Sequence, residues 1–256
     1  MADLNIMVVA YLYFFVVGVC LGSFSNVLIY RIPLKQSIAK GRSHCGGCNR
    51  QIPAYDLIPI VSYVILKGRC RFCNEKIGII HPIIELMGGL VAVFCFWFFK
   101  FDPLGLVVYA IMMVLMVIAI IDWRHMIIPD SLNAILLILF GVYLFFTYQS
   151  WQSHLLGALV VPGIMIATNL LVPSSFGGGD VKLMIASGIG LGLANSLLAG
   201  FIGVIVAGGY AFYLILTKKV NRKSHIAFGP YLCLGIVAAV FYGPKIIQSY
   251  LDLFNI

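Results

Sequence analysis

Charge is the scarcest property of this 256-residue sequence, because charged side chains make up 10% of it and only nine residues are acidic. Hydrophobic residues account for 62%, and the mean hydropathy is +1.04. A soluble protein of this length has no need of so large an apolar fraction, so the composition predicts a polytopic membrane protein. The apolar runs are about 20 residues long, as membrane helices require, which excludes a β-barrel of short alternating strands.

Basic residues are absent before Arg31, so the N-terminal segment lacks the basic region of a cleavable signal peptide. Residues 4–30 carry no charge and are predicted to form a first transmembrane helix, in which Gly18 and Gly22 are spaced for close helix packing. The next 46 residues, 31–76, hold nine of the 17 Lys and Arg side chains and only two acids. By the positive-inside rule, this loop faces the cytoplasm and the N-terminus lies outside.

Further apolar runs predict crossings at residues 77–99, 104–121, 132–148, 155–172 and 226–247. Residues 183–217 form a 35-residue uncharged run, which is too long for one crossing of about 20 residues. Two crossings, divided near residues 193–196, would return the four basic residues of 218–223 to the cytoplasm. The sequence therefore predicts an all-α polytopic membrane protein of about eight helices with both termini outside. Its predicted parts are a first helix at 1–30, a cytoplasmic loop at 31–76 and a seven-helix core at 77–256.

Four of the seven cysteines lie in the polar loop as C-x2-C-x21-C-x2-C, namely Cys45, Cys48, Cys70 and Cys73. This spacing is close to that of zinc ribbons, whose four thiolates form a closed structural site. A cytoplasmic loop disfavours disulfides, so the pattern favours zinc over a redox dithiol pair. The other three cysteines lie in apolar runs and are interpreted as packing residues.

Two aspartates interrupt apolar runs. Asp122 stands in the sequence IIDWR, and Asp180 follows three glycines at the end of 49 residues without charge. An ionisable side chain at such a position is a functional candidate, because burying it unpaired costs several kcal/mol. The order of the predicted crossings places both aspartates on the cytoplasmic side, near the membrane boundary.

If these two carboxylates meet, they hold one proton between them near neutral pH. The ionised member can deprotonate a water while the protonated member donates to a carbonyl oxygen, which is peptide hydrolysis of the aspartic-protease type. Two alternatives stay open on the residues alone. The aspartates either relay ions or protons in a transporter, or pair with Arg124 and Lys182 at the membrane interface. Transport sites, however, lie nearer the bilayer midplane.

Other residues suggest lesser roles. Glu85, within the second predicted crossing, either shapes the active site or pairs with a polar neighbour in the bundle. Asp130 is predicted to cap the helix of the fourth crossing rather than to act as a catalytic acid. The triple glycine is not a phosphate loop, because it follows a transmembrane helix and lacks the G-K-[ST] ending. The net charge of +8 is assigned to membrane orientation and lipid headgroup contact, with no nucleic-acid partner.

Together these motifs resemble the type IV prepilin leader peptidases, a branch of the GxGD membrane aspartic proteases. The resemblance includes GSFSNVLIYRIP at 22–33, the four-cysteine loop, PIIE at 82–85, Asp122, FGGGDVK at 176–182 and FGPY at 228–231. It implies a multi-pass enzyme of the bacterial inner membrane that removes the basic leader of type IV prepilins or type II secretion pseudopilins on the cytoplasmic face. Asp122 and Asp180 would be its catalytic pair.

The resemblance also implies methylation of the new N-terminal residue, usually Phe, with S-adenosylmethionine as the methyl donor. The loop of 46 residues is too small for a separate methyltransferase domain, and no GxGxxG follows a strand, so no motif places the donor site. A GxGD protease without methyltransferase activity is the alternative within this group. A basic leader is repelled by the basic loop, so we expect affinity to come from the apolar helix of the substrate, with anionic lipid between the charges.

Overall fold

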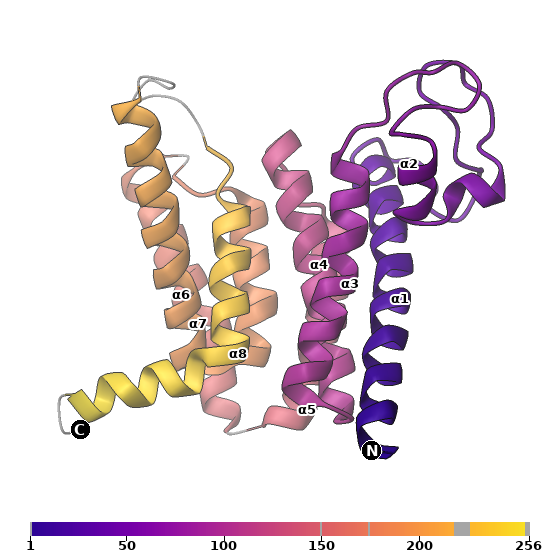
Figure 1. Ribbon diagram of the computed structural model, residues 1–256. Coiled ribbons are helices and arrows are strands. Elements are labelled where there is room, and N and C mark those ends of the chain that lie inside the picture. The colour runs from indigo at the N-terminus through magenta and orange to yellow at the C-terminus, as the bar shows by residue number, and fades with distance from the viewer. Residues whose placement is uncertain (1, 149, 174, 218–225, 254–256) are drawn as a thin grey trace. The chain divides into compact units, whose positions relative to one another are not determined.

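The computed structural model describes residues 2–148, 150–173, 175–217 and 226–253 (Figure 1). Its helices are α1 (Ala2–Arg31), α2 (Val61–Ile65), α3 (Ile80–Phe99), α4 (Pro103–His125), α5 (Asp130–Thr147), α6 (Trp151–Leu171), α7 (Gly178–Leu216) and α8 (Gly229–Leu253), with a short 3-10 helix at Ala54–Leu57. Among these residues, β-structure is confined to two isolated bridges in the loop. The all-α prediction is therefore confirmed.

The chain forms two compact units, residues 1–109 and 110–256. The domain boundaries predicted at residues 30 and 76 stay a prediction.

Seven of the described helices, α1 and α3 to α8, are long and apolar enough to cross a membrane. The sequence predicts about eight crossings, and the difference lies in α7. Its 39 residues include the run in which two short crossings are predicted. The basic segment 218–223, which favours two crossings, lies outside the described residues.

Helix α7 reverses direction at Gly192, whose φ of 74° and ψ of 176° are not helical. A straight helix would separate Gly178 from Gly208 by about 45 Å, at a rise of 1.5 Å per residue. Instead, Phe176 and Gly208 line one recess, and the ring of Tyr210 lies 5.8 Å from that of Trp123 in α4. Helix α7 is thus a hairpin of two arms, and its turn lies next to the division predicted near residues 193–196.

Small residues let the helices of the second unit pack closely around this turn. A Cβ atom on Gly157 of α6 would lie 2.6 Å from the carbonyl oxygen of Gly188, in the first arm of α7. Ser196, in the second arm, donates a hydrogen bond of 3.2 Å to the carbonyl oxygen of Gly157. A Cβ atom on Gly203 would lie 3.0 Å from the side chain of Leu232 in α8. Both arms of α7 are therefore held by close packing at glycines and by this hydrogen bond, as is usual in membrane proteins.

In the first unit, α1 packs against α3 through the glycines singled out in the sequence. A Cβ atom on Gly22 would lie 2.8 Å from the carbonyl oxygen of Ile84, and one on Gly88 would lie 2.5 Å from that of Gly18. The predicted packing face of α1 is confirmed.

The loop between α1 and α3 is attached at both helices. The guanidinium of Arg31 donates hydrogen bonds to the carbonyl oxygens of Ser37, Lys40 and Gly41 at 2.8–3.0 Å. Glu85 Oε2 accepts a 2.7 Å hydrogen bond from the amide of Ile60, whose φ of 61° is rare for a β-branched residue. Of the two readings of Glu85, the structure therefore shows pairing with a polar neighbour, which anchors the loop.

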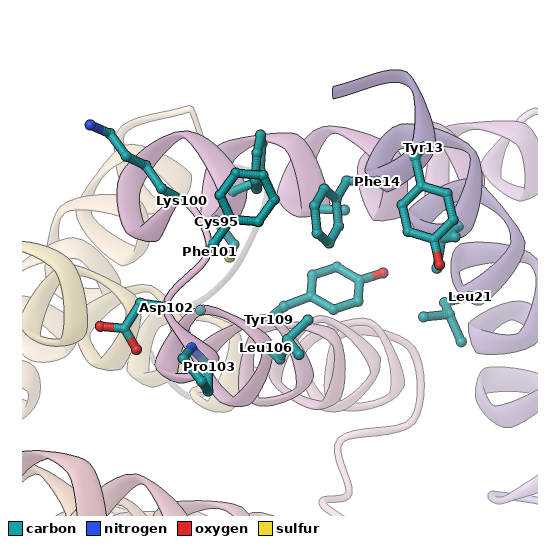
Figure 2. Close-up of a pocket in the computed structure, with 14 residues that line it drawn as sticks. Tyr13, Phe14, Leu21, Cys95, Lys100, Phe101, Asp102, Pro103, Leu106 and Tyr109 are labelled. Carbon is teal, nitrogen blue, oxygen red and sulfur yellow. The ribbon is translucent and has the colours of Figure 1, made fainter. Parts of the chain in front are cut away.

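An apolar pocket of about 320 Å³ lies in the first unit between α1, α3 and the first turns of α4 (Figure 2). Tyr13 and Phe14 of α1 line it together with Cys95 of α3 and Tyr109 of α4. The Tyr109 hydroxyl is buried and has no hydrogen-bond partner in the described part of the chain. The pocket contains neither candidate aspartate and none of the four loop cysteines, so the candidate site lies elsewhere.

Candidate functional site

The four loop cysteines come from two turns with the same backbone form. The Cys45 amide donates to the carbonyl oxygen of Arg50 at 2.9 Å, and the Cys70 amide donates to that of Glu75 at 2.8 Å. Each turn then contains an asparagine with positive φ, 55° at Asn49 and 58° at Asn74. Asparagine tolerates this left-handed conformation better than most residues. The repeated turn brings the two cysteine pairs to a common centre.

The four sulfur atoms lie within 4.8 Å of one another, and those of Cys45 and Cys73 are 3.6 Å apart. In a tetrahedral site, Zn–S bonds of about 2.3 Å hold the sulfurs roughly 3.8 Å apart. A disulfide would need about 2.05 Å, and all four cysteines are free thiols. The cluster can therefore hold a metal ion, with the donor set of a closed structural site.

The thiols differ in acidity. The backbone amides of Cys48 and Gly47 lower the pKa of the Cys45 thiol to about 6. The Glu75 amide lowers the pKa of the Cys73 thiol, but burial and the three other sulfurs outweigh it and raise that pKa to about 12. Four crowded thiolates repel one another, so a bound cation is what allows all of them to ionise.

Side chains outside the cluster tie the two turns together. Arg71 donates to both carboxylate oxygens of Asp56, at 2.8 Å and 2.6 Å, and these bonds lower the pKa of the Asp56 carboxyl. The guanidinium of Arg50 lies 5.3 Å above the ring of Phe72, which joins the first turn to the second. The two turns are thus linked by a cation–π contact in addition to the four sulfurs, and the bidentate ion pair fixes the second turn to the 3-10 helix.

Asp122 lies in the last turn of α4, and its side chain is almost fully buried, with the residue 5% exposed. Its Oδ2 atom accepts a 2.9 Å hydrogen bond from the amide of Gly229, the first residue of α8. A Cβ atom on Gly229 would lie 2.7 Å from that oxygen. Glycine is therefore required for the backbone to approach the carboxylate so closely.

Asp180 lies in the first turn of α7 and is 7% exposed. Its Oδ2 atom accepts a 2.9 Å hydrogen bond from the amide of Gly177, the residue that caps this helix. Gly179 packs against Ile128, because a Cβ atom there would lie 2.8 Å from that of Ile128. Gly178, by contrast, faces open space. The three glycines before Asp180 therefore have different functions.

The two aspartates belong to the same compact unit and are held in the same way. Each carboxylate has one oxygen bonded to a glycine amide at the N-terminal end of a helix, where the helix dipole favours an anion. Ile128 lies beside both Gly179 and Gly229, because a Cβ atom added to either glycine would come within 3.1 Å of the Ile128 side chain. This arrangement provides a buried pair of acids whose remaining oxygens can bind water or a carbonyl group.

The sequence did not single out Gly229 as a site residue. The FGPY block contributes only to the family resemblance, although a glycine before a helix is the signal for a close backbone approach. The capping prediction for Asp130 is wrong, because the rigid Pro129 occupies the capping position and no side chain caps α5. Asp130 instead accepts a 2.7 Å hydrogen bond from Lys182, so this lysine pairs with Asp130 at the surface.

Two family models match the chain. One is described as the Bacterial Peptidase A24 N-terminal domain and matches residues 16–99. The other is described as the Type IV leader peptidase family and matches residues 109–212. The first match contains the four-cysteine cluster, and the second contains Asp122 and Asp180.

Curated relatives match over nearly the whole chain, and each of the following is named prepilin leader peptidase/N-methyltransferase. The protein from Bacillus subtilis is 29% identical over 240 residues, which are 93% of this chain and 97% of the relative. The protein from Vibrio cholerae is 29% identical over 255 residues, 94% of each chain. The protein from Legionella pneumophila is 27% identical over 292 residues, 97% of this chain and 98% of the relative. No solved structure matches the chain.

We predict that replacing Cys45 with Ser lowers the metal content of the purified protein and makes the other three cluster thiols reactive. The reason is that a closed four-sulfur site loses one of its ligands. Metal content by mass spectrometry and thiol titration measure the two effects. Cys20→Ser, in α1, is the control and keeps the metal. A metal-free wild-type protein with four reactive loop thiols and full activity would contradict the assignment.

We predict that Gly229→Ala lowers the rate of peptide cleavage by about 100-fold, the effect of displacing a catalytic group by about 1 Å. The added methyl group would overlap Asp122 Oδ2 and move this carboxylate away from its amide. Gly163→Ala, in α6, is the matched control, because its Cβ atom would meet nothing within 4 Å. Equal rates for the two variants would show that the Gly229 contact does not position Asp122.

Proposed function

The chain belongs to the type IV leader peptidase family, and we propose that it removes the basic leader of type IV prepilins or type II secretion pseudopilins. The observation that carries this proposal is the buried pair of Asp122 and Asp180, each held by a glycine amide. Two buried acids in one site are the groups required for peptide hydrolysis without a covalent intermediate. The relatives that match more than nine-tenths of this chain support the same activity.

In the proposed reaction the two aspartates exchange acid and base roles. The ionised carboxylate takes a proton from a bound water, whose oxygen adds to the carbonyl carbon while the protonated carboxyl donates to the carbonyl oxygen. The aspartate that received the proton from water then donates it to the leaving nitrogen. The C–N bond breaks, and the other aspartate recovers its proton from the tetrahedral hydroxyl group, so the pair returns to its starting state.

The glycine amides have a positioning function in this mechanism. Each binds one carboxylate oxygen at 2.9 Å and leaves the other oxygen for water or substrate. Fixed donors of this kind lower the cost of reorganisation during the reaction, because they are in place before charge moves. Glycines near Asp180 also let an extended substrate backbone approach without steric conflict.

We assign zinc to Cys45, Cys48, Cys70 and Cys73. The donor set supports this choice, because four thiolates in a tetrahedral shell are typical of structural zinc sites. Such a shell has no open position, so zinc holds the two turns together and takes no part in peptide cleavage.

The second proposed activity is N-methylation of the new terminal residue, usually Phe, with S-adenosylmethionine as donor. The names of the relatives support it. The loop of residues 31–76 is too small for a separate methyltransferase domain. We therefore assign the donor site to this loop and to the helix ends beside it.

The proposed location is the bacterial inner membrane, with the cysteine loop and both aspartates on the cytoplasmic side. The excess of Lys and Arg in residues 31–76 supports this orientation, and these side chains also contact anionic lipid headgroups.

A transporter is not favoured, because Asp122 and Asp180 lie at helix ends and the relatives are peptidases. A family member that cuts without methylating is distinguished by an unmethylated product.

We predict that Asp122→Asn and Asp180→Asn each abolish leader cleavage while the protein stays folded, because an amide can neither take nor supply the transferred proton. Cleavage is measured by the mass of a prepilin substrate, and folding by thermal unfolding in detergent. Asp130→Asn is the control, since it removes only an exposed ion pair with Lys182, typically worth about 0–1 kcal/mol. Substantial cleavage by either of the first two variants would exclude the aspartate pair.

A further inference from the structure

A second recess, of about 280 Å³, lies in the same unit as the two aspartates. One wall is formed by Phe176, Phe228 and Tyr231. The second arm of α7 also lines it, through the small or apolar residues Val204, Ala207, Gly208 and Ala211. The lining is almost entirely apolar, and the volume suits one large side chain better than a complete small molecule.

This recess adjoins both of the glycine amides that hold the aspartates. Phe176 precedes Gly177, whose amide binds Asp180, and Phe228 precedes Gly229, whose amide binds Asp122. The two phenylalanine rings meet edge to face at 5.1 Å. A group that enters the recess therefore lies against the backbone segments that position the reacting carboxylates.

Tyr231 also lines the recess. This residue is 6% exposed, and its hydroxyl is buried without a hydrogen-bond partner among the described residues. A buried hydroxyl without a partner costs free energy, and such groups in native proteins usually bind something. The hydroxyl is covered in this structure, so an entering peptide chain reaches it through a shift of the Tyr231 side chain and then supplies the N–H and C=O groups that it lacks, whereas a lipid acyl chain supplies neither.

We infer that this recess binds an apolar side chain of the substrate polypeptide close to the bond that is cut, with the Tyr231 hydroxyl bonded to the substrate backbone. The inference rests on the proposed leader cleavage and names a specificity site for it. Charge supports it as well. The loop of residues 31–76 carries nine basic and two acidic residues, so it repels a basic leader, and binding must come from an apolar part of the substrate.

Two adjacent glycines in α7 provide a matched test. Neither Gly208 nor Gly209 has any atom within 4 Å of an added Cβ atom, but only Gly208 lines the recess. Gly208→Leu therefore fills the recess, while Gly209→Leu adds the same side chain outside it. With full-length enzyme in detergent and a prepilin substrate, we expect Gly208→Leu to lower kcat/KM by about tenfold or more, the usual effect of excluding a large apolar group. We expect Gly209→Leu to have no more than a small effect.

A set of substrates identifies the side chain that is bound. The apolar residues flanking the cut bond are replaced by Ala one at a time, and we expect one replacement to lower kcat/KM for the wild type but not for Gly208→Leu. Tyr231→Phe, which keeps the ring, is expected to raise KM without lowering the melting temperature, because it removes a buried hydroxyl that has no partner among the described residues. This second variant keeps the test valid if Gly208→Leu does not fold.

Wild-type values of kcat/KM in both Gly208→Leu and Tyr231→Phe would overturn the inference. So would equal losses in Gly208→Leu and Gly209→Leu. If lipid fills the recess instead, Gly208→Leu changes the melting temperature but leaves kcat/KM unchanged, and this result also contradicts the inference. Failure of the wild-type enzyme to cut any prepilin would instead contradict the proposed function itself.

Discussion

Two carboxylates buried in an apolar helical protein are the constraint on which the rest of this structure depends. An ionisable group there is costly unless it is hydrogen-bonded, and each aspartate obtains its bond from one glycine amide. For Asp180 this amide comes from the start of its own helix. For Asp122 it comes from the start of α8, 107 residues away. The close packing of α6, α7 and α8 through glycine and alanine therefore serves to bring distant helix ends to one site.

The sequence was sufficient for the features that depend on local composition. Uncharged runs predicted the helices, C-x2-C pairs predicted the sulfur cluster, and lone acids in apolar runs predicted Asp122 and Asp180 as candidates. It was not sufficient where two distant segments decide the outcome. Nothing near Gly229 in the sequence indicates that its amide binds Asp122, and Asp130 pairs with Lys182 rather than capping its own helix. The reversal of α7 was predicted from charge counting, but its location at Gly192 depends on packing against α6.

The two compact units separate two kinds of chemistry. The first presents four sulfurs on a loop anchored by Arg31 and Glu85. The second contains the acids and the apolar recess beside them. In the proposed enzyme, the recess binds the apolar part of a substrate while the acids cut the adjoining bond. Substrate affinity and peptide hydrolysis then use the same unit, which is consistent with the aspartates and the recess sharing Phe176 and Phe228 as neighbours.

The most direct test is the intact mass of a prepilin after incubation with the purified protein, with and without S-adenosylmethionine. We predict loss of the leader in both samples and one added methyl group on the new N-terminus only when the donor is present. Cleavage without the methyl group would retain the aspartate pair and remove the transferase assignment. An intact prepilin, beside a control enzyme that cuts it, would contradict the account.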